Sequence, residues 1–437
     1  MASVATTPDQ DRPGLRTRVM ALLLLAYIFN FIDRQIIGIL AIPIKTDLGL
    51  TDGQLGLMGG LAFALFYTGL GIPIAVLADR ANRARIIAVA VTIWSAFTVL
   101  CGFANSFLQL FLARMGVGVG EAGGVAPSYS LISDYFPPER RARALAVFSF
   151  GIPIGSALGV FLGGWLASAV DWRTAFIVVG VAGVLVGPAI WWGVPEPARG
   201  RYDKGGAAAH KTAPFGAVLA RVTSRPSFWF LAFGAACSSI MGYGLAFWVP
   251  SVFARSFGMS LGQISLYYGT IVLLGGLLGV WMGGAISDRL GRRSPAFYAV
   301  VPGVAFLLAV PLYAGGLFVT DLWLGFPLFL LPTALALAWL GPVVAAIQHI
   351  VPPPMRATAS AMFLFINNLI GIGFGTWFLG GFADSLKPTY GDDALRWAIF
   401  YCLSFYLLAA VFMALAAWRL PRDWWREPEA GQSVVTG

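Results

Sequence analysis

Twelve long apolar stretches constrain this 437-residue chain more than any other feature of its sequence. Each has about the ~20 residues that an α-helix needs to cross a lipid bilayer. With 58% hydrophobic and 11% charged residues, the composition excludes a disordered chain, a nucleic-acid-binding domain and a disulfide scaffold. We therefore predict an all-α membrane protein with twelve transmembrane helices, over 18–44, 55–78, 86–104, 107–132, 143–169, 173–194, 227–254, 263–286, 295–318, 322–350, 357–384 and 395–418.

The distribution of Lys and Arg predicts the orientation in the membrane. An even number of crossings places both termini on one side, and 22 of the 29 basic residues lie in the tails and loops of that side. The opposite side holds five, and Arg34 and Arg114 lie inside apolar stretches. Since cytoplasmic loops carry the excess of Lys and Arg, we expect both termini in the cytoplasm. The net charge of +9 is then a sign of topology and not of a nucleic-acid partner.

One hydrophilic segment divides the apolar stretches six and six. We therefore expect an N-terminal six-helix bundle over 1–194, a cytoplasmic linker over 195–226, a C-terminal six-helix bundle over 227–420 and a cytoplasmic tail over 421–437. Within the linker, 214–223 has the pattern of a short helix lying at the membrane surface.

The two parts of the chain contain an internal repeat. At an offset of 209 positions, six residues of the first part meet identical residues of the second without a gap. The pairs are Gly49 with Gly258, Gly53 with Gly262, Gln54 with Gln263, Asp79 with Asp288, Arg80 with Arg289, and Arg83 with Arg292. This repeat predicts two pseudo-symmetric copies of one six-helix unit.

The second copy of the charged loop resembles the signature loop of the major facilitator superfamily. The residues that carry the likeness are Gly284, Asp288, Arg289, Gly291, Arg292 and Arg293. In such a loop glycine lets helices approach, while Asp and Arg join helix ends by charge-assisted hydrogen bonds that can break and re-form. We expect both loops to act in gating. A basic loop that only obeys the topology rule would explain the Arg residues but not the spacing of Gly and Asp.

Four ionisable residues remain at membrane depth: Asp33, Arg34, Arg114 and Glu121. Such residues are costly in a bilayer and are functional candidates by default, although a purely structural ion pair is the alternative. Asp33 and Arg114 are expected at similar depths, with Glu121 about 10 Å closer to the cytoplasm. A carboxylate that alternates between a paired and an apolar environment could bind and release a proton, and Asp33 is the first candidate, followed by Glu121. Which of Asp33 and Arg34 faces a cavity stays open.

Polar and aromatic residues elsewhere in the spans could line a substrate cavity. We expect such a lining from Asn30, Tyr243, Phe247, Trp248, Trp339, Asn367 and Asn368. No metal site or cofactor is expected, because His210 and His349 stand apart and the GVGVGEAGG stretch lies inside a span instead of following a strand. The chain shows no pattern of an enzyme.

Three stretches of the N-terminal part are similar to the Spinster family, in a bacterial form: FNFIDRQ at 29–35, ADRANR at 78–83 and the block at 114–159 beginning RMGVGVGEAGG. The resemblance places the family's Asp-Arg pair on Asp33 and Arg34, and its later Arg and Glu on Arg114 and Glu121. It implies a proton-linked carrier of lysolipids, sphingoid lipids or other amphipathic substrates, working by alternating access.

That resemblance also implies a multi-pass protein of the bacterial inner membrane. Its expected partners are substrate, protons and membrane lipids, and we expect a monomer. Two alternatives stay open. One is an organic anion or aromatic acid:proton symporter, in which Arg34 or Arg114 binds a carboxylate. The other is multidrug efflux, since lipophilic cations also suit an aromatic cavity.

Overall fold

The computed structural model describes residues 13–78, 80–202 and 214–425, and within them the chain is helical with no strand. The N-terminal group of helices comprises α1 (Pro13–Ile39), α2 (Ala41–Leu48), α3 (Asp52–Gly59), α4 (Leu61–Ala78), α5 (Arg83–Gly102), α6 (Phe107–Glu121), α7 (Val125–Tyr135), α8 (Pro138–Ser149), α9 (Gly151–Ala169) and α10 (Trp172–Gly193). After the central segment come α11 (Phe215–Thr223) and the C-terminal group, with α12 (Pro226–Phe257), α13 (Leu261–Gly291), α14 (Phe297–Phe318), α15 (Leu322–Leu337), α16 (Leu340–Ile350), η2 (Pro353–Met355), α17 (Arg356–Tyr390), η3 (Gly391–Asp393), α18 (Ala394–Cys402) and α19 (Ser404–Asp423).

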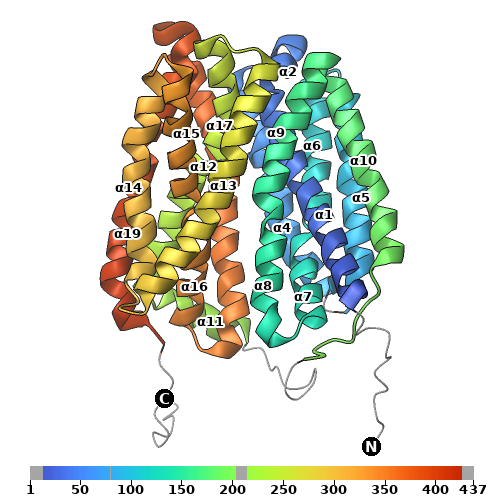
Figure 1. Ribbon diagram of the computed structural model, residues 1–437, viewed down its shortest axis with the longest axis vertical. Helices are drawn as coiled ribbons and strands as arrows, with labels where there is room; N and C mark the ends of the chain where they lie inside the picture. The colour runs from blue at the N-terminus through green and yellow to red at the C-terminus, as the bar shows by residue number, and fades with distance from the viewer. Residues whose placement is uncertain (1–12, 79, 203–213, 426–437) are drawn as a thin grey trace, which may run out of the picture.

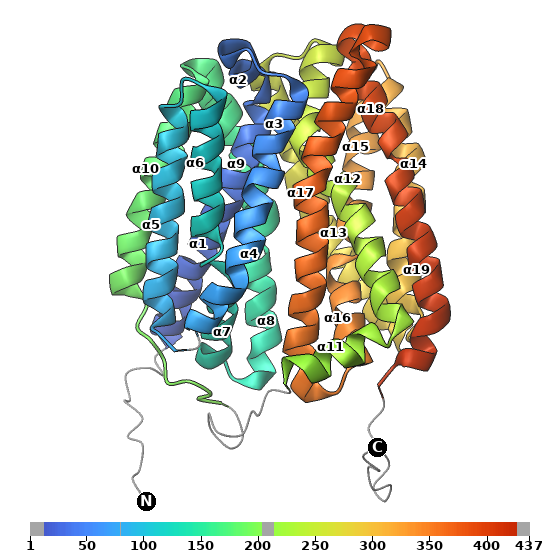
Figure 2. The ribbon, with the colours of Figure 1, turned by 180° about the vertical axis from the view of Figure 1, so that it is seen from behind.

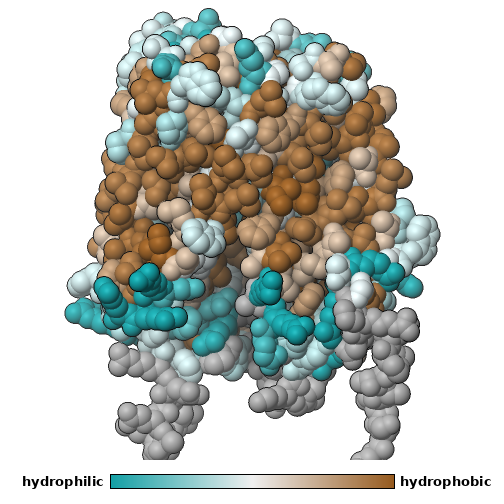
Figure 3. Space-filling view, viewed as in Figure 1, coloured by the Kyte–Doolittle hydropathy of each residue, from teal (hydrophilic) through white to brown (hydrophobic). Residues whose placement is uncertain are grey.

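The two groups lie side by side (Figures 1 and 2). Helix α1 begins and α19 ends at the same end of the molecule, which we call the terminal end; α11 lies across it. The opposite end, which carries α2, is the distal end. Figure 3 shows an apolar band around the middle of the visible face, bounded at the terminal end by a hydrophilic rim. This arrangement is that of a multi-pass membrane protein.

Ten helical stretches of the described chain are long and apolar enough to cross a membrane, whereas the sequence predicted twelve. Two local features account for the difference. The stretch predicted over 107–132 is divided into α6 and α7, each too short to count alone. The final stretch, Thr358–Asp423, has 66 residues and combines two of the predicted helices.

The internal repeat is visible as two copies of one turn. Gly49 and Gly258 end their helices in the left-handed conformation, with φ of 64° and 65°. Glycine suits this position because it has no Cβ to oppose positive φ. Two residues later, Thr51 and Ser260 each cap the following helix in a capping box, with Gln54 and Gln263 as the respective partners. The offset of 209 residues therefore reflects a shared local structure.

Two seams join the groups from the distal end toward the middle. In the seam between α3 and α17, a Cβ added at Gly56 would lie 2.3 Å from the carbonyl oxygen of Thr376. In the seam between α9 and α13, a Cβ at Gly164 would lie 2.5 Å from the Cβ of Ser265. Such contacts bring the helix backbones of opposite groups together and need small residues. Within the described residues, the hydrogen bonds between the two groups lie on the distal side of the molecule.

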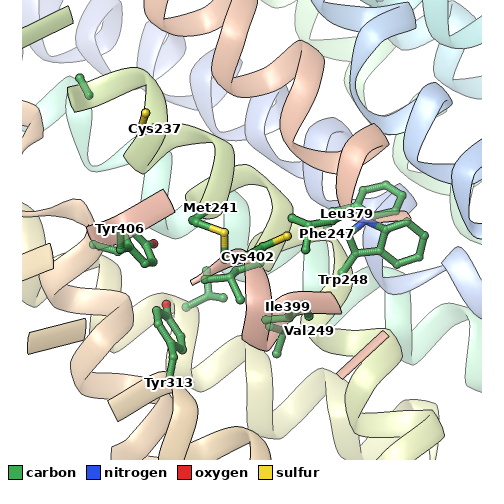
Figure 4. Packing of buried hydrophobic residues seen from close by; sticks show 14 of the residues in the cluster. Cys237, Met241, Phe247, Trp248, Val249, Tyr313, Leu379, Ile399, Cys402 and Tyr406 are labelled. Carbon is green, nitrogen blue, oxygen red and sulfur yellow. The ribbon is translucent and has the colours of Figure 1, made fainter. Parts of the chain in front are cut away.

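Large side chains fill the interior of the C-terminal group. Figure 4 shows Tyr313 and Tyr406 facing one another. Their rings are stacked, with centroids 6.2 Å apart. The three cysteines of the chain, Cys101, Cys237 and Cys402, are free and buried, so they serve as packing residues.

Candidate functional site

The charged residues expected at membrane depth come together inside the N-terminal group. Asp33 and Arg34 lie on α1, and Arg114 and Glu121 lie seven residues apart on α6. Asp33 and Arg114 are each 1% exposed and Glu121 is fully buried. The two helices thus place two acids and two bases within one apolar interior, where each must find a partner or become neutral.

Glu121 is the paired carboxylate. Its Oε2 accepts hydrogen bonds from Arg34 Nε at 2.8 Å and from Asn30 Nδ2 at 2.7 Å. Asn30 lies four residues before Arg34, so both project from one face of α1 toward α6. The ion pair is buried on the Glu121 side, whereas the Arg34 side chain is 12% exposed.

The Asp33 carboxylate has no such partner. Neither of its oxygens forms a hydrogen bond within the described chain, although the side chains of Trp94 and Thr98 lie close to it. Arg114 donates from Nη1 to the backbone carbonyl of Asp33, at 3.1 Å, instead of to the carboxylate. The sequence left open which of Asp33 and Arg34 faces its neighbours. Adjacent residues on a helix point about 100° apart, and Arg34 is the one that faces Glu121.

An aromatic enclosure surrounds the Arg34 guanidinium. Its centre lies 4.5 Å from the Tyr67 ring, 4.9 Å from the Phe63 ring and 5.2 Å from the Phe31 ring. Tyr243 of α12 also lies close to this guanidinium, so the C-terminal group contributes to the site. Sequence reasoning missed Phe63 and Tyr67, although their spacing of four residues places both rings on one face of α4.

The other expected cavity residues lie in the C-terminal group. Asn367 accepts a hydrogen bond from Ser239 at 2.9 Å and donates one to Asn368 at 3.4 Å, which forms a polar cluster between α12 and α17. Trp339 is 5% exposed and contacts Phe363 edge-on.

Phe247 and Trp248 contribute to the closed interface in this conformation. Figure 4 shows them side by side near Leu379. Gly38 of α1 and Gly59 of α3 lie directly against Phe247, while Trp248 donates to the backbone carbonyl of Thr376 at 2.9 Å.

A second charged cluster, which sequence reasoning missed, joins the groups at the distal end. We call it the Asp52 cluster: Lys45, Asp52, Arg255 and Asp384. Arg255 donates to both carboxylate oxygens of Asp52, at 2.6 and 2.7 Å, and Lys45 donates to one of them at 2.6 Å. Asp384 accepts from the backbone N–H groups of Asp52 and Gly53 at 3.1 and 2.7 Å. Asp52 lies directly after the Thr51 cap, and this position within the repeated turn is the sequence signal that could have identified it.

The expected gating loops differ from one another. In the first, Arg83 is buried and bonds to Asp134 at 2.5 Å, Glu196 at 2.6 Å and Ser130 at 2.7 Å, all in the N-terminal part. Arg80 is exposed, and Asp79 lies outside the described residues.

In the second loop the charged residues are exposed and form no ion pair with the described chain: Asp288, Arg289, Arg292 and Arg293. Gly291 packs against the Tyr298 ring. Gly284 was expected to allow close helix approach, but nothing lies within 4 Å of a Cβ placed there. Its neighbour Gly283 makes that contact instead, against Ala338.

The described residues contain no group of three or more His, Cys, Asp or Glu that could hold a metal ion.

Comparisons with known proteins agree with this architecture. The model of the major facilitator superfamily matches residues 23–376, so the chain belongs to that superfamily of membrane transporters. An MFS-type efflux pump of Mycolicibacterium smegmatis is 35% identical over 420 residues, which cover 95% of this chain and 96% of the pump. Protein spinster homolog 1 of Bos taurus is 29% identical over 443 residues, which cover 93% of this chain and 81% of that protein.

The solved structures narrow the assignment. A bacterial homolog of the human lysosomal transporter Spinster, in an inward-facing and unoccupied conformation, matches with a TM-score of 0.87 and 32% identity. The match covers 95% of this chain and 100% of that one. The inward-facing and occupied form matches with a TM-score of 0.83. Within the superfamily the chain is thus a Spinster-type transporter and not an enzyme.

Proposed function

We propose that the chain crosses the bacterial inner membrane twelve times as two six-helix bundles, with both termini in the cytoplasm. A straight helix of 66 residues would be about 99 Å long, too long for a single crossing of a ~30 Å apolar core, and this supports two crossings by Thr358–Asp423. The backbone reverses at Gly391, where φ is 56°. Together α6 and α7 supply the other crossing, because their chain continues across three residues, 122–124. The positive charge of the loops at the terminal end supports the cytoplasmic orientation.

We further propose that the structure represents an inward-facing state of an alternating-access carrier. With the terminal end in the cytoplasm, the Asp52 cluster and the two seams close the opposite side. The exposed charges of the second gating loop, without ion pairs to the N-terminal group, fit an open cytoplasmic side. Rocking of one group against the other would break the Asp52 cluster and bring the gating loops into contact.

Proton coupling at Asp33 is the function that the site supports best, and the observation that carries it is a buried carboxylate with no hydrogen-bond partner among the described residues. Burial without a hydrogen bond to either oxygen disfavours the charged form of a carboxylate, so this conformation favours a proton on Asp33. In the neighbouring Arg34–Glu121 pair, the charge of the carboxylate is already neutralised by the guanidinium. A change in which Arg114 or Arg34 turned toward the Asp33 carboxylate would favour the charged form and release the proton.

The enclosure of Arg34 supports an amphipathic substrate with an anionic head. A guanidinium held among Phe31, Phe63 and Tyr67 keeps a charged centre beside apolar walls, which suits a head group and a hydrocarbon tail respectively. We therefore propose lysolipid-like or sphingoid-like substrates. The same arginine would also bind an aromatic acid, and the relative named as an efflux pump supports efflux as a further candidate.

Transport in proteoliposomes with an imposed pH gradient tests both proposals. The wild-type protein, Asp33→Asn and Asp392→Asn would be offered a fluorescent lysolipid and, in parallel, a small aromatic carboxylate. We expect gradient-driven lysolipid movement in the wild type and in the Asp392→Asn control, where the exposed carboxylate lies at the distal end. Asp33→Asn should lose the response to the gradient. Full gradient-driven transport by Asp33→Asn would exclude the coupling role, and movement of the carboxylate alone would assign the protein to anion symport.

A further inference from the structure

A group of arginines lies where α11, α12 and α19 meet at the terminal end. Arg221 belongs to α11, Arg225 caps α12 and Arg419 lies on the last turns of α19. Among the residues that the structure describes, they share one nearby carboxylate, that of Asp423, which is 4% exposed. Its Oδ1 lies 3.5 Å from Arg225 Nη1 and 3.9 Å from Arg419 Nε, and its Oδ2 accepts from the backbone N–H of Ser227 at 3.1 Å. The two ion pairs are long for direct hydrogen bonds.

The positive charge of this group is therefore not neutralised within the described chain. Arg221 forms no ion pair there, and the buried Nε atoms of Arg221 and Arg419 have no hydrogen-bond partner. Burial and the charge of Arg225 lower the pKa of the Arg221 guanidinium, as expected where like charges are gathered. Three guanidinium groups beside one carboxylate leave room for a further anion.

An aromatic stripe runs from these arginines toward the middle of the membrane. Trp229 and Phe233 follow Arg225 at intervals of four residues, so the three share one face of α12. The Trp229 and Phe233 rings stack at 5.8 Å, and Phe233 contacts Phe412 of α19 at 6.1 Å. Phe412 precedes Arg419 by two helical turns. Since Phe233 is 38% exposed, the stripe faces the lipid side of the α12–α19 seam.

Helix α11 places the arginines at the depth of lipid head groups. Val218 and Val222 are buried against the protein, whereas Phe215 and Leu219 are 62% and 40% exposed. The helix lies across the terminal end of the C-terminal group (Figure 2). A short helix with exposed apolar side chains and a basic residue is typical of the membrane interface. The arginines therefore lie at the level of the lipid head groups, and the rings of the aromatic stripe lie next to them on the side of the membrane interior.

We propose that Arg221, Arg225 and Arg419, with the stripe of Trp229, Phe233 and Phe412, bind an anionic phospholipid of the leaflet at the terminal end. The arginines hold the phosphate, and the acyl chains lie along the stripe. Basic pockets between membrane helices select lipids with a net negative charge over zwitterionic ones, whose own cation would approach the arginines. This site is separate from the Arg34 enclosure and does not depend on the proposed substrate or on proton coupling.

Native mass spectrometry of the full-length protein in detergent tests the site. The protein would be incubated with phosphatidylglycerol or with phosphatidylcholine carrying the same acyl chains, and bound lipid would be counted for each variant. The double variant Arg221→Gln/Arg419→Gln keeps Arg225 beside Asp423. At about 1 kcal/mol for each basic residue near a lipid surface, it should bind phosphatidylglycerol roughly 10- to 30-fold more weakly. Phosphatidylcholine binding should not change.

The matched control is Arg289→Gln/Arg292→Gln, which removes two exposed arginines at the same end of the C-terminal group and should keep wild-type affinity. Elution profiles and thermal unfolding without lipid would show that both double variants are folded. Equal phosphatidylglycerol binding in wild type and Arg221→Gln/Arg419→Gln would overturn the proposal. So would an equal loss in both double variants, since it would reduce the effect to general surface charge.

Discussion

Replacing Arg255 by Gln removes the cation that joins the two groups of helices through the Asp52 cluster. In the structure this side chain is 18% exposed and holds an Asp52 carboxylate that is 6% exposed. Two hydrogen bonds of 2.6 and 2.7 Å connect them in a bidentate pair. Such a pair exists only while the distal end is closed, so its loss should weaken that state relative to one in which the groups have parted.

The expected magnitude follows from the remaining partners of Asp52. A buried pair that loses one member costs about 3–5 kcal/mol, because the other charge is left without compensation. Here Lys45 stays on the carboxylate at 2.6 Å, and the cluster is partly open to solvent. We therefore expect about 2 kcal/mol, within the range for hydrogen bonds to charged groups. This corresponds to a roughly 30-fold shift in the ratio of closed to open distal ends.

Distance measurements between spin labels can follow this shift. Thr46, on α2 beside the start of α3, and Thr389, on α17, are exposed and lie at the distal end in opposite groups, so cysteines introduced there can carry the labels. The native cysteines are all buried and should remain unlabelled. We expect a single short distance in the otherwise unchanged protein. In Arg255→Gln a longer distance should gain a large population.

Lys387→Gln is the matched control, because it removes an exposed positive charge at the same end that belongs to no ion pair of the described chain. The reasoning would be refuted if Arg255→Gln left the distance distribution unchanged. It would also be refuted if Lys387→Gln produced the same change, which would point to net charge instead of the specific pair.

Two further predictions concern the interior. Arg34→Ala should lower the free energy of unfolding of the purified protein by about 3–5 kcal/mol, because it leaves the buried Glu121 charge with Asn30 as its remaining hydrogen-bond donor; adding Glu121→Gln should recover much of the loss, and additive effects of the two substitutions would argue against the pair. Gly56→Ala should destabilise the closed distal end relative to the open one by about 1–3 kcal/mol, because the new methyl group would lie 2.3 Å from the Thr376 carbonyl oxygen. Gly381→Ala, where the added Cβ meets nothing within 4 Å, should leave the same spin-label distances unchanged.

Membrane crossing and the repeat could be predicted from the sequence because both rest on local pattern. Apolar length, loop charge and the shared Gly-to-Gln turn are each properties of short segments, and Gly49 and Gly258 indeed adopt the same left-handed conformation. The division of the stretch over 107–132 was missed because a break between α6 and α7 leaves the hydropathy of the chain unchanged.

The charged site was predictable in membership but not in pairing. The free-energy cost of a charge in the apolar core of the bilayer marks every ionisable residue in a span, so Arg34 and Glu121 were identified as candidates. Which acid meets which base depends on the rotation of α1 relative to α6, and that is set by packing across the whole group. The Asp52 cluster escaped for a different reason: its members stand at span ends, where charges are ordinary, and only the tertiary fold reveals that Arg255 reaches across.

The two seams between the groups are equivalent by the repeat but are held together by different forces. At the position after the helix cap, the first copy has Asp52 and the second has Leu261. Charges therefore lock the α3–α17 seam, whereas the α9–α13 seam is closed by small and aromatic side chains such as Gly269 against Phe161. Raised salt or loss of a cation should weaken the α3–α17 seam but not the α9–α13 seam. The distal end should therefore open at α3 and α17, while α9 and α13 stay in contact and act as the hinge. Label pairs across α3 and α17 would then separate further than pairs across α9 and α13.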